Sequence, residues 1–289
     1  KNGKGLDFEI SLDRCADIVT LSLNGANMGY FAPCGYVSLN YYDNKGSGFL
    51  KSFTAGFFTT CGLTAVGSPC VDEGEELPLH GTISNTPCES YSWYIENDEI
   101  HVKANIRDAA LFGNKLMLKR EYICSLLENT IILKDKIENI GFSESPLEVL
   151  YHCNMGYPLL SENAIINIPS KEVIPRNEHA KEGIENCVIM EKPQRDYQEK
   201  CYYHALSDKT TVSIFNPDIK KGLKISYDTS ELKYFTEWKM MGEGDYVLGL
   251  EPGNCLPDGR DIMRKQGKLE FLKPGDTKNH SIKFEFTEE

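Results

Sequence analysis

The chain has 289 residues, of which 43 are acidic and 31 are basic, so its formal net charge is −12. This charge repels a phosphate backbone and no basic stripe opposes it, which argues against nucleic-acid binding. No apolar run is long enough to cross a bilayer, and the first residues lack the hydrophobic region of a signal peptide, so we expect no membrane partner.

The ten cysteines are scattered singly along the chain and none forms a C-x-x-C pair. That spacing does not match a zinc or redox site, and several cysteines lie in apolar strand-like runs where a thiol acts as a small core residue. We therefore expect free thiols in a reducing cytoplasm, with no metal.

Period-two alternation of apolar and polar residues dominates the chain from end to end. Such alternation is typical of strands with one buried and one solvated face, and turn residues separate about seventeen possible strands. The clearest candidates in chain order are 17–23, 35–42, 100–106, 116–126, 130–138, 146–154, 164–168, 201–206, 210–215, 223–227, 245–251 and 282–286.

Helical patterns are scarce, and only segment 176–190 is expected to hold one or two turns. Strands without intervening helices exclude a doubly wound parallel sheet and favour antiparallel sheets stacked face to face. No repeat, low-complexity tract or linker interrupts the pattern. We therefore predict a single all-β domain over residues 1–289, a large antiparallel β-sandwich.

Glu251 follows the apolar run Val247-Leu248-Gly249-Leu250 and precedes Pro252. A carboxylate at the end of a buried strand is partly desolvated, which raises its pKa toward the range of a general base. A structural alternative is that Glu251 pairs with Arg260 or Arg264.

Two histidines and one tryptophan are further candidates. His152 shares a strand face with Asn154, and it is either a proton donor or a hydrogen-bonded core histidine. His80 precedes Gly81, which allows a close backbone approach, although a loop histidine bonded to the main chain fits equally. Trp238 is either a platform for the C–H face of a sugar, beside Lys239, or a core residue.

Three segments, in this order, resemble the aldose 1-epimerase (galactose mutarotase) superfamily, and more closely an uncharacterised epimerase-like branch of it. They are Leu79-His80-Gly81, His152-Cys153-Asn154-Met155-Gly156-Tyr157 and Gly249-Leu250-Glu251-Pro252. The resemblance to that branch covers nearly the whole chain and extends to 57–63, 80–87 and 238–244.

The resemblance implies a β-sandwich of the supersandwich type that holds a sugar on the concave face of one sheet and needs no cofactor. It implies that Glu251 takes the proton of the anomeric hydroxyl while His152 protonates the ring oxygen, with His80 holding a hydroxyl or sharing the acid role. Asn154, Trp238 and Lys239 are then expected to bind substrate.

The family's substrate-binding arginine, found in an Asn-Arg-Ile-like segment before the first histidine, has no equivalent in 50–79. Arg14 is the remaining candidate for that role.

Three functions stay open on the sequence: anomer interconversion of a free aldose, sugar binding without turnover, and epimerisation of an anionic sugar bound by Lys239, Arg14 and Arg260. The sugar and the oligomeric state, a homodimer included, are left open too.

Overall fold

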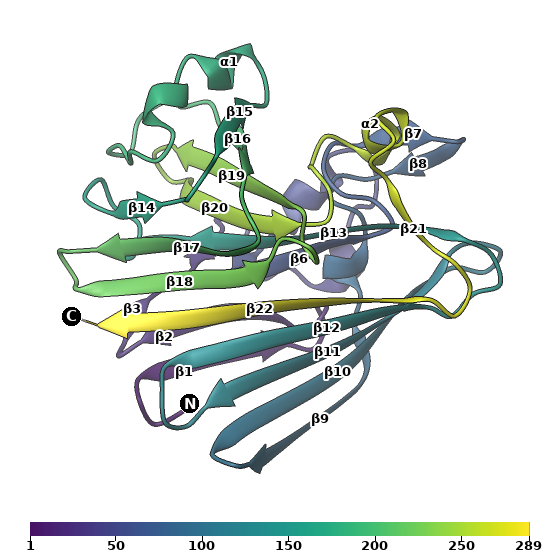
Figure 1. Cartoon of the computed structure of the whole chain (residues 1–289), viewed down its shortest axis with the longest axis horizontal. Helices are drawn as coiled ribbons and strands as arrows, with labels where there is room; N and C mark the ends of the chain where they lie inside the picture. Colours follow the sequence, from purple (N-terminus) through teal and green to yellow (C-terminus); the bar gives the residue numbers. More distant parts are fainter. Residues whose placement is uncertain (289) are drawn as a thin grey trace.

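The computed structural model describes residues 1–288, and its architecture is two stacked antiparallel sheets (Figure 1). The larger sheet has eight strands, which in spatial order are β14 (Ile165–Asn167), β17 (Lys209–Asn216), β18 (Lys221–Asp228), β22 (Thr277–Glu288), β12 (Thr130–Asn139), β11 (Lys115–Ser125), β10 (Glu99–Ala109) and β9 (Cys88–Glu96). The predicted all-β sandwich is confirmed.

The second sheet has seven strands and carries the residues of most interest. In spatial order its strands are β15 (Glu172–Pro175), β16 (Lys200–Ala205), β19 (Tyr234–Met241), β20 (Tyr246–Gly253), β13 (Ser145–Met155) and β21 (Glu270–Leu272), and β6 (Phe58–Leu63) also pairs with β13. Strand β13 lies at the centre, between β20 on one side and β6 on the other.

Smaller elements from the first third of the chain, here called the N-terminal layer, pack beside the two large sheets. They are the three-stranded sheet β1 (Leu6–Ser11), β2 (Asp17–Leu23) and β3 (Ala26–Asn27), and the pairs β4 (Tyr30–Phe31) with β5 (Ala55–Gly56) and β7 (Cys70–Asp72) with β8 (Glu75–Leu77). Short 3₁₀ turns at Leu39–Tyr41, Gly48–Lys51 and Ile83–Asn85 join them.

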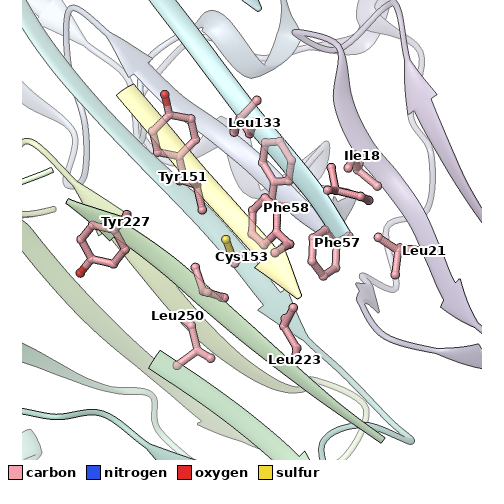
Figure 2. Packing of buried hydrophobic residues seen from close by; sticks show 14 of the residues in the cluster. Ile18, Leu21, Phe57, Phe58, Leu133, Tyr151, Cys153, Leu223, Tyr227 and Leu250 are labelled. Carbon is pink, nitrogen blue, oxygen red and sulfur yellow. The ribbon is translucent and has the colours of Figure 1, made fainter. Parts of the chain in front are cut away.

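The main hydrophobic core lies between the two large sheets (Figure 2). Leu133 and Leu223 come from the eight-stranded sheet, and Tyr151, Cys153 and Leu250 come from the seven-stranded sheet. Because side chains alternate along a strand, the neighbours His152 and Glu251 must point to the opposite face of their sheet, away from this core.

A buried arginine joins the N-terminal layer to the large sheet. The guanidinium of Arg120 in β11 is fully buried and makes two hydrogen bonds to Asp135, at 2.9 and 2.6 Å, and one to Asp17 of β2 at 2.6 Å. Tyr151 also donates to Asp135. A buried charge is tolerated when it is paired and its donors are satisfied, as they are here.

Two details of the predicted elements differ from the structure. Segment 35–42 is not a strand but a largely exposed loop that contains a 3₁₀ turn at Leu39–Tyr41. Segment 176–190 does hold two short turns, α1 (Glu178–Lys181) and a 3₁₀ turn at Ile184–Asn186, while the helix α2 (Arg260–Lys265) was not predicted.

The ten cysteines are all free, as expected. Within residues 1–288, no helix is long and apolar enough to cross a membrane.

Candidate active site

A cavity of about 290 Å³ opens on the face of the seven-stranded sheet that points away from the core. This volume lies at the lower end of the range for small-molecule sites, about 300–1,000 Å³. Its floor comes from β13, β16, β19 and β20, and its walls come from loops of the N-terminal layer together with Arg176, Glu199 and Pro257. It is lined by Ser47, Phe49, Leu50, Phe53, Gly67, Ser68, Leu79, His80, His152, Arg176, Glu199, Cys201, Thr236, Trp238, Glu251 and Pro257.

His152 and Glu251 stand side by side on the floor of this cavity. Their strands, β13 and β20, are neighbours, and Cys153 pairs with Leu250 in the register, which puts the two residues next to each other. Nε2 of His152 lies 3.1 Å from Oε1 of Glu251, and the side chains are 6% and 2% exposed. The contact is not a hydrogen bond, and Oε1 has no hydrogen-bond partner among residues 1–288.

Burial shifts the pKa values of both groups toward their neutral forms. It raises the pKa of Glu251 well above its ordinary value, and the negative charge of Glu199 adds to the shift while Arg176 opposes it. Burial also lowers the pKa of His152 to about 4, against the opposing effect of its hydrogen bond to Asn154. A buried acid and a buried imidazole with displaced pKa values in a cavity are typical of an acid–base site.

Gly249 explains how the Glu251 side chain fits over the sheet. The two residues share a strand face, and a Cβ at position 249 would lie 2.2 Å from Oε1 of Glu251 and 3.0 Å from the Cβ of Trp238. Only glycine leaves room for the carboxylate to lie back over the strand. The Gly-Leu-Glu spacing is therefore a packing requirement of this site.

Aromatic rings surround His152. The rings of Phe53 and Trp238 each lie 5.2 Å from its imidazole, centroid to centroid, and the ring of His80 lies 5.6 Å away. Trp238 is half-buried and its Nε1 donates to Glu199 at 2.7 Å. Trp238 therefore belongs to the cavity wall and not to the core between the sheets.

His80 reaches the cavity from the loop after β8. Its backbone has φ of +59°, and Gly81 follows with φ of +71°. Position 81 requires glycine, because a Cβ there would lie 2.4 Å from the carbonyl oxygen of Gly62. Nδ1 of His80 is buried without a hydrogen-bond partner in the described part of the chain. Burial, and secondarily the charge of His152, lowers the pKa of His80 to about 3.

Asn154 does not line the cavity. It is fully buried, its Oδ1 lies 2.6 Å from Nδ1 of His152, and its Nδ2 donates to the carbonyl oxygens of Ala55 and His152. The expectation that Asn154 binds substrate is not supported, because the imidazole and the β5 backbone already use its polar atoms.

Lys239 is a clear correction. It pairs in register one position after Trp238 and so points to the opposite face of β19, where its side chain is 2% exposed. Its Nζ donates to the carbonyl oxygens of Asn186 and Ile189 and to Glu191. Adjacent strand residues cannot both face one ligand, so Lys239 is placed away from the cavity.

Arg14 and Arg260 also lie away from the cavity. Arg14 is buried and donates to the carbonyl oxygens of Ser52 and Val37 and to Oδ1 of Asn85, so it fixes the loop that forms one wall. Arg260 is held by Asp72 at 2.7 Å and by Glu75 at 2.6 Å and does not pair with Glu251. The cationic pocket expected from Lys239, Arg14 and Arg260 is therefore not assembled.

Two charged residues of the cavity were missed from the sequence. Arg176 follows β15 and donates to Ser68 at 2.8 Å, with Asp258 at 3.6 Å from its Nε. Glu199 precedes β16 and accepts from Trp238. Both lie in irregular segments, where no alternation reports which way a side chain points. The arginine that lines the cavity is therefore Arg176 and not Arg14, the candidate from the sequence.

Metal ligation is a separate question. Among residues 1–288 there is no group of three or more His, Cys, Asp or Glu side chains arranged to hold a metal ion.

Comparison with known proteins agrees with this architecture. A family model described as "Domain of unknown function (DUF4432)" matches residues 1–286. The chain belongs to this family. A search of curated proteins returned no match.

Solved structures extend the likeness to the fold. A putative aldose 1-epimerase from Klebsiella pneumoniae is 24% identical and superposes with a TM-score of 0.93, over 100% of this chain and 78% of that one. A galactose mutarotase-like protein from Clostridium acetobutylicum is 14% identical, with a TM-score of 0.73 over 99% and 94% of the two chains. A galactose mutarotase related enzyme from Lactobacillus acidophilus is 12% identical, with a TM-score of 0.67 over 98% and 95%. The DUF4432 chain therefore has the galactose mutarotase-like fold predicted from its three motifs.

Proposed function

We propose that this chain is an isomerase of the aldose 1-epimerase type, which interconverts the α and β anomers of a free aldose. The observation that carries the proposal is the contact between His152 and Glu251, 3.1 Å apart at the floor of a cavity of about 290 Å³. Ring opening needs an acid and a base that act on one C–O bond, and each positioned group typically contributes about 10²–10⁴-fold to the rate.

The reaction is a pair of proton transfers. One member of the pair accepts the proton of the anomeric hydroxyl while the other donates a proton to the ring oxygen, and the bond between C1 and the ring oxygen breaks. Rotation about the C1–C2 bond and the reverse transfers close the ring as the other anomer. No atom is gained or lost, and the pair returns to its starting protonation state.

The remaining cavity residues fit the recognition of a neutral sugar. The Trp238 ring offers a flat apolar surface for C–H groups, and Thr236, Ser68 and His80 offer hydroxyl and imidazole groups for hydrogen bonds. The one cationic side chain of the cavity, Arg176, is partly neutralised by Asp258 and shares the space with Glu199 and Glu251. This charge balance favours an uncharged aldose over a phosphorylated or sulfonated one.

The test is anomer exchange measured by NMR on a panel of aldoses, with sugar phosphates included. We expect exchange above the spontaneous rate for at least one neutral aldose and a loss of about 10²–10⁴-fold in Glu251→Gln. Glu96→Gln, an exposed glutamate on β9, is the matched control and should match the wild type. Equal rates in wild type and Glu251→Gln would remove Glu251 from the reaction. Calorimetric binding of a sugar without exchange would replace catalysis by recognition alone.

A further inference from the structure

The side-chain amide of Asn154 has only one orientation that satisfies its surroundings. Nδ2 lies 2.7 Å from the carbonyl oxygen of His152 and 3.1 Å from that of Ala55, and both of these atoms can only accept hydrogen bonds. Turning the amide over would bring its oxygen against two carbonyl oxygens in a buried site, and each unsatisfied group there costs about 1–3 kcal/mol. Oδ1 must therefore face the imidazole of His152.

This orientation determines which ring nitrogen of His152 carries the proton. Oδ1 is an acceptor with no hydrogen of its own, and it lies 2.6 Å from Nδ1. A neutral imidazole has one N–H and one lone pair, so a proton on Nδ1 leaves the lone pair on Nε2. Nε2 is the nitrogen that lies 3.1 Å from Glu251.

Four charged or titratable groups surround this imidazole besides its own strand. Glu251 faces it from β20, and His80 faces it from the loop after β8. Glu199 and Arg176, on the segments that flank β16 and β15, act on the pair through Glu251 with opposite signs. None of the four is hydrogen-bonded to Nδ1, whose side-chain partner is Asn154.

We propose that Asn154 is a positioning residue that keeps Nδ1 of His152 protonated and so makes Nε2 the one nitrogen that exchanges protons with Glu251 and the substrate. The proposal rests on the proposed function for its catalytic meaning, because the exchange it describes is the one that opens the sugar ring.

One proton then serves the pair. Before the transfer this proton lies on the carboxyl of Glu251, whose pKa burial raises well above its ordinary value, and Nε2 presents a lone pair. Its transfer to Nε2 gives a carboxylate, which can accept the anomeric proton, and an imidazolium, which can donate to the ring oxygen. The Nδ1–H bond to Asn154 persists through both states and stabilises the imidazolium. Solvent needs to supply no proton, in keeping with the burial of both groups.

The direct test is ¹⁵N NMR of the full chain labelled at its six histidines, with the His152 signals assigned by comparison with His152→Gln. At pH 7 we expect a neutral ring with a protonated Nδ1 and an unprotonated Nε2. A proton on Nε2 in the wild type would overturn the proposal. This measurement needs no substrate, so it decides the role of Asn154 even if no aldose is turned over and the proposed function fails.

Two substitutions separate positioning from folding. Asn154→Asp keeps an acceptor at Nδ1 and adds a negative charge, so we expect the tautomer to be retained and the titration of His152 to move up by about 1–3 pH units. Asn154→Leu removes the acceptor, so we expect a mixture of tautomers and a kcat about 10–100-fold lower with KM little changed. Asn279→Leu, at an exposed asparagine of β22, is the matched control.

The proposal fails if Asn154→Leu keeps both the tautomer and kcat of the wild type, or if the His152 titration does not move in Asn154→Asp. If the leucine variant does not fold, the wild-type tautomer and the aspartate variant still decide the question.

Discussion

Two histidine–glutamate pairs cross neighbouring strands of the same sheet, one on each face. His152 and Glu251 line the cavity, 3.1 Å apart, and Oε1 of the glutamate has no hydrogen-bond partner within residues 1–288. His204 of β16 and Glu237 of β19 are 3.0 Å apart on the opposite face, where both side chains are 0% exposed; a hydrogen bond joins Nε2 to Oε2, and only Oε1 of Glu237 lacks a partner within residues 1–288.

The partners of the second nitrogen differ in the same way. Nδ1 of His204 is bonded to the hydroxyl of Ser170, which can donate or accept, whereas Nδ1 of His152 faces an amide oxygen that can only accept. The buried pair, His204 and Glu237, has no space for a ligand, and its partner Ser170 can donate or accept. Both features suit a structural pair. The open pair has a cavity above it and a fixed partner beneath it. Residue type alone therefore does not separate the pair that we propose to be catalytic from a buried pair of the same composition.

The largest effects expected from this comparison are a loss of stability in one leucine variant and a loss of exchange rate in the other. His204→Leu leaves the Glu237 carboxyl buried without its partner, so we expect a loss of about 3–5 kcal/mol in the free energy of unfolding, with the exchange rate per folded molecule unchanged. His152→Leu should instead lose about 10²–10⁴-fold in exchange rate. Urea unfolding and anomer exchange by NMR check both. The distinction collapses if both variants lose mainly stability or both lose mainly activity.

A smaller effect is expected from Gly249→Ala, which disturbs only the open pair. The new methyl group would lie 2.2 Å from Oε1 of Glu251, so the carboxylate must move. Displacement of a reacting group by about 1 Å can cost about 10²-fold in rate, so we expect a loss of that order in kcat with little change in Tm. Gly113→Ala, in the turn between β10 and β11, is the control. Full activity in Gly249→Ala would show that the observed position of the carboxylate is not the reactive one.

The smallest effect concerns pH. Because the pKa of His152 is lowered to about 4, its Nε2 stays unprotonated until the pH falls through that value. Protonation then leaves the pair with no base, so the rate should fall below about pH 4 and stay within about twofold between pH 5 and 7. A histidine of ordinary pKa, about 6.5, would already lose most of its activity at pH 5. Exchange rates from pH 3.5 to 7.5, corrected for the spontaneous reaction, distinguish the two.

The sequence predicted the fold well because alternation is a local property of each strand. The resemblance singled out His152 and Glu251, which are far apart in the chain, and the β13–β20 register brings them together in the cavity, while their catalytic role stays a prediction. The same alternation should have excluded Lys239, since Trp238 and Lys239 are consecutive in one strand. Arg176 and Glu199 were not predicted because their segments are irregular, and their direction depends on how the loops pack against the sheet.

The hydrogen bonds of Arg14 hold one wall of the cavity, and this wall is separate in sequence from the strands that form the floor. Phe49, Leu50 and Phe53 form one wall, and Arg14 anchors that wall at Ser52 and Val37. His152 and Glu251 stand on β13 and β20, outside this wall, although the Phe53 ring of the wall lies 5.2 Å from the His152 imidazole. In the proposed enzyme, exchange of residues 47–51 between relatives would therefore change the wall that faces the sugar while Phe53, His152 and Glu251 stay in place, so sugar preference and reactivity could diverge in this scaffold.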